Sequence, residues 1–257
     1  MTSAGDAAAR GAPAHAALVG ATIRIPIPGP LAEASFLQRP NRFLLLCRLR
    51  HTGEVVAAHL ADPGRLKEIL LPGVRIWLRR EPPGRGARST AWSALLVEAA
   101  DGLVSLHTTL PNRLVRVAIE ARALQELDGW ELERAEVPLG RSRIDFLLRR
   151  GDERLALEVK SVSLVEGGLA LFPDAVTARG ARHVRELTLL AGRPGWAAGI
   201  LFVVQRANPQ GVRAAASIDP TFAAALTAAR AAGVHILARR CRVSLEALEL
   251  GEAIPCE

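Results

Sequence analysis

Residues 143–162 constrain the fold more than any other part of the sequence, because apolar and polar residues alternate on both sides of a turn. Gly151-Asp152 suits a two-residue hairpin loop, in which Arg150 pairs with Glu153. That register places six apolar residues on one face, in the pairs Leu148–Leu155, Phe146–Leu157 and Ile144–Val159. A slip of one residue would scatter them over both faces, so the sequence predicts a hairpin in this register.

The same register sets Asp145 opposite Glu158, with their Cβ atoms about 5 Å apart, and puts Lys160 on the same side of the hairpin. Two close carboxylates repel, and one takes up a proton unless a cation lies between them. Carboxylate oxygens suit Mg²⁺, which also takes water and phosphate oxygens as ligands. We therefore predict that Asp145, Glu158 and Lys160 are catalytic and that Asp145 and Glu158 hold Mg²⁺. The alternative is a surface strand with a Glu–Lys ion pair worth less than about 1 kcal/mol.

Lysine is rare in this chain. Of 33 basic residues, only Lys67 and Lys160 are lysine, and the others are arginine. Arginine does not give up its proton in a protein, whereas a buried lysine can be tuned to do so. A lysine could position or deprotonate a metal-bound water, or stabilise charge on a phosphate. Its rarity favours a specific role for Lys160.

The net charge of +7 favours a polyanionic partner, although an arginine-rich composition alone would give the same charge. Nucleic acid is the expected partner, and DNA is favoured over RNA. Aromatic residues make up only 4% of the chain, and tyrosine is absent. This argues against a base-stacking platform and for weakly sequence-specific contacts with the phosphate backbone.

Three distant cysteines without a CxxC pair predict neither a disulfide framework nor a zinc site. The longest apolar run, residues 196–204, is too short to span a bilayer. We therefore expect a cytoplasmic protein without a membrane partner. The oligomeric state is left open, a homodimer included.

The order of the predicted elements divides the chain into three parts. Residues 1–22 form an Ala/Gly/Pro-rich tail, and residues 23–107 form a small β-barrel of the OB type. This barrel is built from predicted strands at 42–50, 54–60, 73–80, 90–98 and 103–107. Residues 108–257 form an α/β domain with helices at 112–128 and 177–191 and a third helix capped by Asp219. Predicted strands at 131–138, 143–149, 154–162, 197–204 and 234–239 complete it, with 197–204 central and Asn112 as the cap of the first helix.

The order helix, strand, strand ending near Asp145, strand with E-V-K, helix, strand resembles the PD-(D/E)xK nuclease fold. Several motifs resemble the sugar fermentation stimulation protein A family: RPNRF (39–43), AHLADPGRL (58–66), SRIDFLL (142–148), LEVKSVSL (157–164), FPDAVTARGARHVREL (172–187) and IDP (218–220). The resemblance covers roughly residues 36–250. It implies a DNA-binding protein with an OB-like N-terminal domain and a nuclease-like C-terminal domain, linked by name to the regulation of sugar metabolism, notably of maltose.

The resemblance also suggests roles for residues outside the hairpin. Glu136 matches a glutamate that the family often shows, and it is a candidate third metal ligand. The family usually has Asn where this chain has Asp62, and commonly Glu where it has Val117. Glu120, one turn further along the helix, could replace that acid or could lie on a solvated face. The candidate nucleic-acid contacts are Arg42, Arg65, Arg143, Arg179, Arg182 and His183, while Asp174 is expected to cap the second helix.

Two functions remain open. The first is a Mg²⁺-dependent nuclease that uses Asp145, Glu158 and Lys160. The second is a non-catalytic DNA-binding regulator of sugar metabolism genes that keeps the nuclease fold. The sequence shows no helix-turn-helix signature, so it favours weakly specific binding over a sequence-reading repressor.

Overall fold

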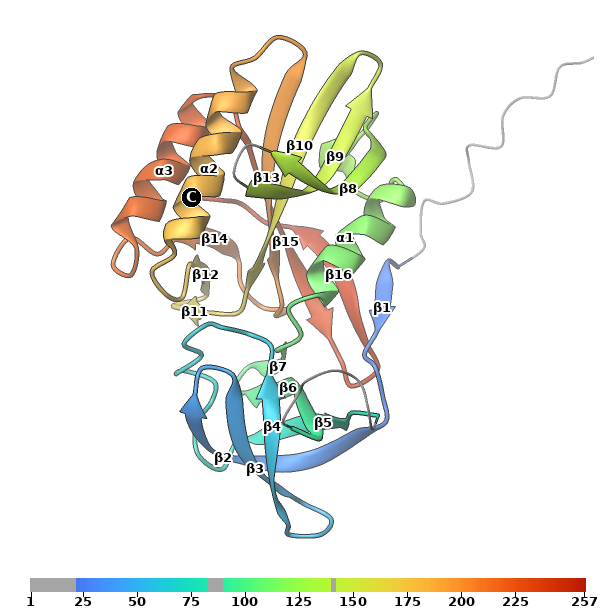
Figure 1. Ribbon diagram of the computed structural model, residues 1–257, viewed down its shortest axis with the longest axis vertical. Helices are drawn as coiled ribbons and strands as arrows, with labels where there is room; N and C mark the ends of the chain where they lie inside the picture. Colours follow the sequence, from blue (N-terminus) through green and yellow to red (C-terminus); the bar gives the residue numbers. More distant parts are fainter. Residues whose placement is uncertain (1–21, 83–89, 140–141) are drawn as a thin grey trace, which may run out of the picture.

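The computed structural model describes residues 22–82, 90–139 and 142–257, and shows two domains stacked end to end (Figure 1). Most of the predicted tail and most of the loop 81–88 lie outside the described residues. The barrel domain holds β2 (Leu31–Asn41), β3 (Leu44–Leu49), β4 (Val55–Leu60), β5 (Arg75–Arg80), β6 (Trp92–Ala99) and β7 (Gly102–Ser105). The α/β domain follows from α1 (Leu110–Glu120) onward.

The N-terminal barrel closes because β4 pairs with both β3 and β6, so the strand order β4-β3-β2-β5-β6 returns to its start. Its core is filled by buried aliphatic side chains such as Leu45, Leu60 and Ile76. The five predicted strands are present, and the barrel fold is confirmed. β2 was not predicted, because two irregularities in its pairing with β3 interrupt its alternation.

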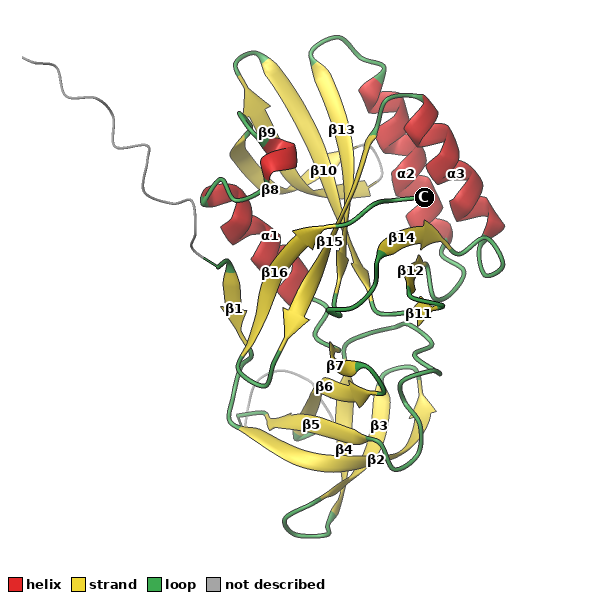
Figure 2. Ribbon diagram, turned by 180° about the vertical axis from the view of Figure 1, so that it is seen from behind, coloured by secondary structure: helices red, strands yellow, loops and turns green. Residues whose placement is uncertain are grey.

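The C-terminal domain is a seven-stranded sheet with helices on both faces, in the order β1-β16-β15-β13-β10-β9-β8 (Figure 2). Its strands are β8 (Glu131–Leu139), β9 (Ser142–Arg150), β10 (Glu153–Val162), β13 (Trp196–Val204), β15 (His235–Val243) and β16 (Ala247–Ala253). Helix α1 covers one face, and α2 (Ala178–Ala191) and α3 (Pro220–Ala231) cover the other. The apolar strand β13 is central, as predicted, and helices on both sides of the sheet bury both of its faces.

One strand of this sheet comes from the start of the described chain. β1 (Arg24–Pro26) pairs antiparallel with β16, so these residues belong to the α/β sheet and not to the barrel that was predicted from residue 23. Three further strands form a small separate sheet that the sequence analysis did not predict: β11 (Val165–Glu166), β12 (Leu169–Phe172) and β14 (Gly211–Ala214). β16 was not predicted either.

Helix α1 is shorter than the predicted helix 112–128. It ends at Glu120, after which Arg122 adopts a left-handed backbone (φ 53°) that turns the chain. The apolar pattern continues beyond the helix because Leu124 and Leu127 are buried too, through a turn and a short 3₁₀ helix, Gln125–Leu127. Thr109 precedes the helix, so Asn112 lies inside it and is not its cap.

The two domains share an apolar core. Trp77 and Leu96 of the barrel pack in the same cluster as Leu110 and Leu114 of α1. Arg206, which is 6% exposed, also donates to Asp101 on the barrel and to the carbonyl of Ser163. The barrel is therefore held at the end of the sheet where β10 finishes.

No helix in the described ranges is both long enough and apolar enough to cross a bilayer.

Candidate functional site

The hairpin of β9 and β10 carries the predicted carboxylates. The structure confirms the register at Arg150–Glu153, Leu148–Leu155 and Phe146–Leu157, but the pairing ends there. Beyond that point the N–H of Val159 donates to Asp145 Oδ2 at 2.8 Å, instead of to a carbonyl of β9. The strands separate, so the predicted ladder pair of Asp145 and Glu158 does not form.

Ile144 shows the consequence of this separation. It is buried among Val184 and Leu187 of α2, on the opposite face from Phe146. The prediction of six apolar residues on one face is therefore wrong for Ile144. Because β9 leaves β10 at Asp145, the strict alternation of the two strands ends where the site begins.

Glu158 is buried, and only one of its two carboxylate oxygens has a partner. Oε1 accepts from Lys160 Nζ at 2.6 Å and lies 2.7 Å from His183 Nδ1. Arg179 Nε donates to His183 Nε2 at 3.4 Å, so the ring proton lies on Nδ1 and is donated to Glu158. Oε2 is buried without any hydrogen-bond partner. A buried acceptor that lacks a partner needs explanation, and a bound cation supplies one.

Asp145 accepts its hydrogen bonds from other groups than Glu158 does. Its Oδ1 accepts from Asn112 Nδ2 of α1 at 2.7 Å, while Oδ2 accepts from the Val159 backbone. Asn112 was predicted to cap the helix, and its contact with Asp145 was not predicted because the helix and the hairpin are far apart in the chain. Glu120 does not replace an acid at Val117, since it pairs with Arg116 and is about half exposed.

The two carboxylates differ in their electrostatics. Burial, and then the charge of Glu158, raise the pKa of Asp145 to about 6. Burial also pushes the pKa of Glu158 upward, but the hydrogen bond from His183 and the charge of Lys160 outweigh it, and that pKa is lowered. Glu158 is therefore charged over a wider pH range than Asp145, and a further cation near Asp145 would lower its pKa again.

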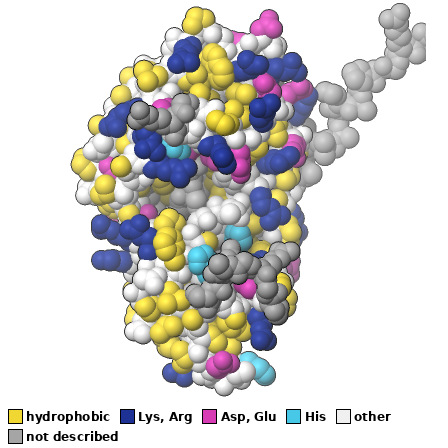
Figure 3. All heavy atoms as spheres, in the orientation of Figure 1, with side chains coloured by type: hydrophobic (Ala, Val, Ile, Leu, Met, Phe, Trp, Pro, Cys, Tyr) yellow, Lys and Arg dark blue, Asp and Glu magenta, His cyan; other side chains and the backbone are white. Residues whose placement is uncertain are grey.

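These residues line one cleft of about 840 Å³ between the two domains. The cleft brings together Asp145, Glu158 and Lys160 with three of the predicted nucleic-acid contacts, Arg42, Arg179 and His183. Arg65 lines a hollow that adjoins the cleft. Arg143 and Arg182 line neither space. In Figure 3, Lys and Arg side chains gather near the junction of the two domains, next to hydrophobic side chains.

Three predicted roles need correction. Glu136 does not line the cleft. It adopts a left-handed backbone (φ 54°) in β8, is 73% exposed and pairs with Arg143. His183 is only 5% exposed, so it orients Glu158 and is not available to contact nucleic acid directly.

The third correction concerns Asp174. Thr177 caps α2 by accepting from Gly180 N, and Asp174 faces the barrel instead. Asp219, which caps α3 as predicted, also accepts from Thr177 N at 2.8 Å. One buried carboxylate therefore fixes the start of two helices, including the one that carries His183 and Arg179.

A second pair of carboxylates lines the cleft on the barrel side. Asp62 accepts from Gly64 N at 2.8 Å. A Cβ atom at Gly64 would lie 1.9 Å from Asp174 Oδ2 and 2.9 Å from Asp62 Oδ1, so only glycine allows this close approach. Burial is the main cause that raises the pKa of Asp62, to about 6, and the pKa of Asp174 also lies above its ordinary value.

Two carboxylates, Asp145 and Glu158, could hold a metal ion in this cleft. Within residues 22–82, 90–139 and 142–257, no group of three or more His, Cys, Asp or Glu side chains is gathered closely enough to hold one. Mg²⁺ is commonly bound by one or two carboxylates, with water and substrate phosphate as the other ligands. The unpartnered Oε2 of Glu158 beside a carboxylate with a raised pKa fits such an ion.

Comparison with known proteins gives consistent matches over both domains. Residues 109–247 match the family described as the sugar fermentation stimulation protein RE domain, and residues 37–106 match the SfsA N-terminal OB domain. The sugar fermentation stimulation protein homolog of Shouchella clausii is 46% identical over 227 residues, which are 88% of this chain and 97% of the relative. The homolog of Moorella thermoacetica is 45% identical over 221 residues, 85% of this chain and 93% of the relative.

A solved structure is similar over nearly the whole chain. Pyrococcus furiosus SfsA, solved in complex with Ca²⁺, superposes with a TM-score of 0.80 at 30% identity. The match covers 93% of this chain and 100% of the archaeal chain.

Proposed function

The chain belongs to the sugar fermentation stimulation protein family, and we propose that it binds DNA with weak sequence specificity and hydrolyses phosphodiester bonds at a Mg²⁺ site. Asp145 and Glu158 would hold the ion. One observation carries this proposal: Glu158 Oε2 is buried without a partner, while Oε1 takes both Lys160 and His183. A side chain serving only as an ion-pair partner would not need its second oxygen buried and unsatisfied.

The relative from Pyrococcus furiosus supports a divalent ion, since its structure is a complex with Ca²⁺. Both Ca²⁺ and Mg²⁺ prefer oxygen ligands. When bound, such an ion supplies charge stabilisation at a phosphate oxygen and lowers the pKa of a coordinated water. The chain's own residues provide the remaining parts of the reaction.

Among the described residues, Lys160 donates to Glu158 Oε1, and its ammonium has two further N–H donors. Its side chain is 12% exposed, so the ammonium can meet a phosphate at the cleft wall. There it would neutralise negative charge that develops during attack on phosphorus. His183 fixes the orientation of Glu158, and Asn112 fixes Asp145. Arg179 is exposed at the same cleft and can bind a flanking phosphate.

Cleavage and binding test this proposal separately. Single-stranded, duplex and branched DNA and an RNA strand would be incubated with the full chain and Mg²⁺, and products would be resolved on denaturing gels. Asp145→Ala and Lys160→Ala should each reduce cleavage about a thousandfold. Glu136→Ala, which removes a carboxylate outside the cleft, should cleave like the parent.

Binding is measured in EDTA, where no cleavage occurs. Affinity for DNA should fall steeply as the salt concentration rises, because cationic side chains displace counterions from phosphates. A salt-independent affinity would exclude nucleic acid as the partner. Absence of cleavage on every substrate, with binding intact, would exclude the nuclease.

A second candidate is the non-catalytic DNA-binding regulator of sugar metabolism genes. The observation that favours it is the small number of ligands, because Glu136 lies outside the cleft and the described residues hold no cluster of three ligand side chains. A non-catalytic regulator would bind metal and DNA but would not cleave DNA, so the cleavage assay decides between the regulator and the nuclease.

A further inference from the structure

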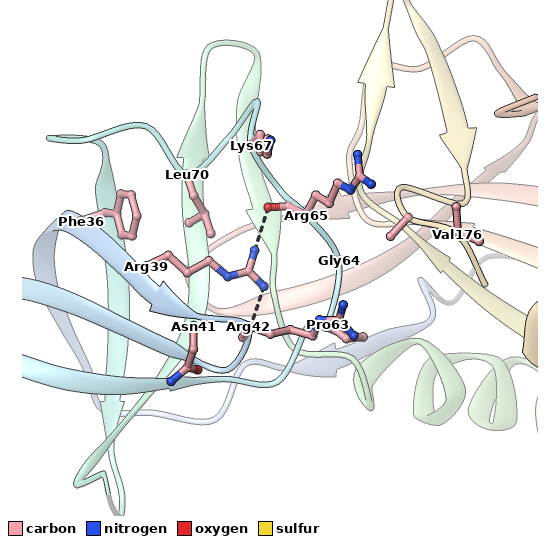
Figure 4. A pocket seen from close by; sticks show the side chains of 11 residues that line it. Phe36, Arg39, Asn41, Arg42, Pro63, Gly64, Arg65, Lys67, Leu70 and Val176 are labelled. Atoms are coloured by element: carbon pink, nitrogen blue, oxygen red, sulfur yellow. Dashed lines mark hydrogen bonds between the residues drawn. The ribbon is translucent and has the colours of Figure 1, made fainter. Parts of the chain in front are cut away.

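A second hollow adjoins the carboxylate cleft on the barrel side. It encloses about 530 Å³ and is lined by residues of β2, of the loop 62–67 and of the loop before α2. Figure 4 shows Arg39 at its centre, with the side chains of Arg42 and Arg65 reaching toward Val176. The two spaces share a common wall of Arg42, Pro63, Gly64, Ala175 and Val176. A single extended ligand can therefore occupy both.

The hollow is strongly basic, and the nearest acids, Asp62 and Asp174, lie behind Gly64 and do not line it. Arg42, Arg65 and Lys67 are exposed and form no ion pair with any described residue, and none of the lining residues is acidic. Arginines elsewhere on the same barrel behave differently, because Arg50, Arg75 and Arg79 each pair with a glutamate. Cations left unpaired around one concave surface repel each other, and an anionic ligand would remove that repulsion.

Arg39 stabilises the backbone around the hollow, and its donors are used there and not on a ligand. Its guanidinium donates to the carbonyls of Arg65 and Arg42, both at 2.7 Å, and to that of Asp62 at 3.4 Å. These bonds tie the end of β2 to the loop 62–67. They fix the backbone that carries Arg42 and Arg65, so the two cations are placed before any ligand arrives.

The backbone between the two loop cations is strained. Leu66 is fully buried and has a left-handed backbone (φ 51°), which costs about 1 kcal/mol or more for a residue other than glycine. Its burial anchors the loop in the barrel core and leaves Arg65 and Lys67 exposed on either side. Strain of this kind is retained where the surrounding structure needs one particular backbone path.

Both lysines of the chain line these two adjoining spaces. The chain has two, and Lys67 lines this hollow while Lys160 lines the adjoining cleft. The other walls of the hollow include edges of Phe36, Leu70 and Val176, which suit the sugar or base of a nucleotide. The space therefore combines phosphate-binding charges with apolar contacts.

We propose that this hollow is a second phosphate-binding subsite, formed by Arg42, Arg65 and Lys67. It takes a phosphate of the same nucleic-acid strand whose neighbouring phosphate lies at Asp145 and Glu158. The inference rests on the proposed function and adds a substrate class to it, namely a single strand that leaves the α/β domain across the barrel rim. The phosphate is either internal to the strand or a terminal monophosphate, and the two share the same chemistry.

The test measures binding of the full chain in EDTA. The probes are labelled single strands of about ten nucleotides with a 5′-phosphate, a 3′-phosphate or hydroxyl ends, followed by fluorescence anisotropy at several salt concentrations. Lys67→Ala and Arg65→Ala should each weaken binding about fivefold to tenfold and reduce the salt slope by about 0.7, the value for one lost phosphate contact. Lys67→Arg should bind within about twofold of the parent because it keeps the charge.

Arg193→Ala is the matched control. Arg193 is exposed, forms no ion pair with a described residue, and lies before β13 at the far end of the sheet from the cleft. Its loss should change neither affinity nor slope. Affinity for Mn²⁺ should be the same in Lys67→Ala as in the parent, which separates a lost phosphate contact from damage to the carboxylate site.

The outcomes are distinguishable. If Lys67→Ala and Arg65→Ala bind like the parent, the subsite is wrong while the proposed function stands. If the parent itself binds no strand at low salt, both are wrong. If the loss occurs only for a phosphorylated end, the subsite holds a terminal phosphate, and an equal loss for all three probes assigns it to an internal one.

Discussion

Two pairs of carboxylates line the same cleft, and they are neutralised in different ways. In the pair from β9 and β10, Lys160 and His183 both bond to Glu158, and its pKa is lowered. In the pair from the barrel and the loop before α2, neither Asp62 nor Asp174 has an ion-pair partner among the described residues, and both pKa values are raised. Arg39 and Arg65 are the nearby cations, but the guanidinium of Arg39 bonds to three backbone carbonyls and Arg65 forms no ion pair with a described residue.

This difference in pKa indicates which of the two carboxylate pairs is better suited to bind a metal ion. Each pair contains a buried carboxylate oxygen without a partner, Glu158 Oε2 in one and Asp174 Oδ2 in the other. The pairs differ in that only Glu158 has a lowered pKa, because Lys160 and His183 bond to it, while the pKa of Asp145 is raised like that of Asp62. We propose the Asp145–Glu158 pair as the metal site, whereas the Asp62–Asp174 pair packs around Gly64 between the two domains. Three predictions test this contrast.

The largest expected effect is on metal affinity. Glu158→Gln keeps the shape of the side chain but removes the negative charge that Lys160 and His183 hold in place, and should weaken binding of Mn²⁺ or Ca²⁺ by about 100-fold or more. Asp174→Asn removes a carboxylate of the other pair and should weaken it by less than about threefold. Isothermal titration calorimetry measures both. Equal losses in the two variants would show that the pairs act together as one site.

A smaller effect is expected from the residue that orients Glu158. His183→Ala should weaken metal binding by about tenfold to 100-fold, because a partner that fixes a ligand is lost. His183→Asn places an amide N–H near the position of Nδ1 and should restore part of the affinity. The pKa of Glu158, followed by NMR, should rise in His183→Ala. If the affinity falls while that pKa stays lowered, His183 acts by packing alone.

The smallest expected effect is on stability and concerns Asp62. Asn at this position still accepts from Gly64 N but carries no charge. Burial raises the pKa of Asp62 from 3.8 to about 6, so the folded state binds the proton more tightly than the unfolded state does. The associated stability is fully present below about pH 4 and is lost as the pH rises through about 6.

Asp62→Asn should therefore unfold like the parent at pH 4 and be more stable at pH 8 by about 1–2 kcal/mol, below the ceiling of about 3 kcal/mol that the pKa change sets. Urea unfolding at the two pH values measures this. A variant that is less stable at pH 8 would mean that the Asp62 carboxylate has a cationic partner in solution.

The barrel was the more predictable part of the fold, since five of its six strands were expected, but the central hairpin of the α/β domain was predictable too. Alternation and turn residues gave β9, β10 and their register as far as Phe146 and Leu157, since these depend on neighbours close in sequence. β1 was missed because its partner β16 lies at the other end of the chain, and no local pattern indicates such a partner. β16 also pairs with its neighbour β15, but an irregularity in their register interrupts the alternation. β2 was missed for a related reason, since its irregular pairing hides the period of two.

The sequence by itself determined the family and the two kinds of domain, and it predicted that Asp145, Glu158 and Lys160 lie in one site, because residue type and local periodicity are properties of short segments. The tertiary structure alone decided what surrounds those residues. It brought Asn112 to Asp145 and buried His183 against Glu158. It also left Glu136 in solvent and set Lys67 beside the cleft. Burial and the choice of hydrogen-bond partner depend on contacts between segments far apart in the chain, and these exist only once the barrel and the sheet have packed together.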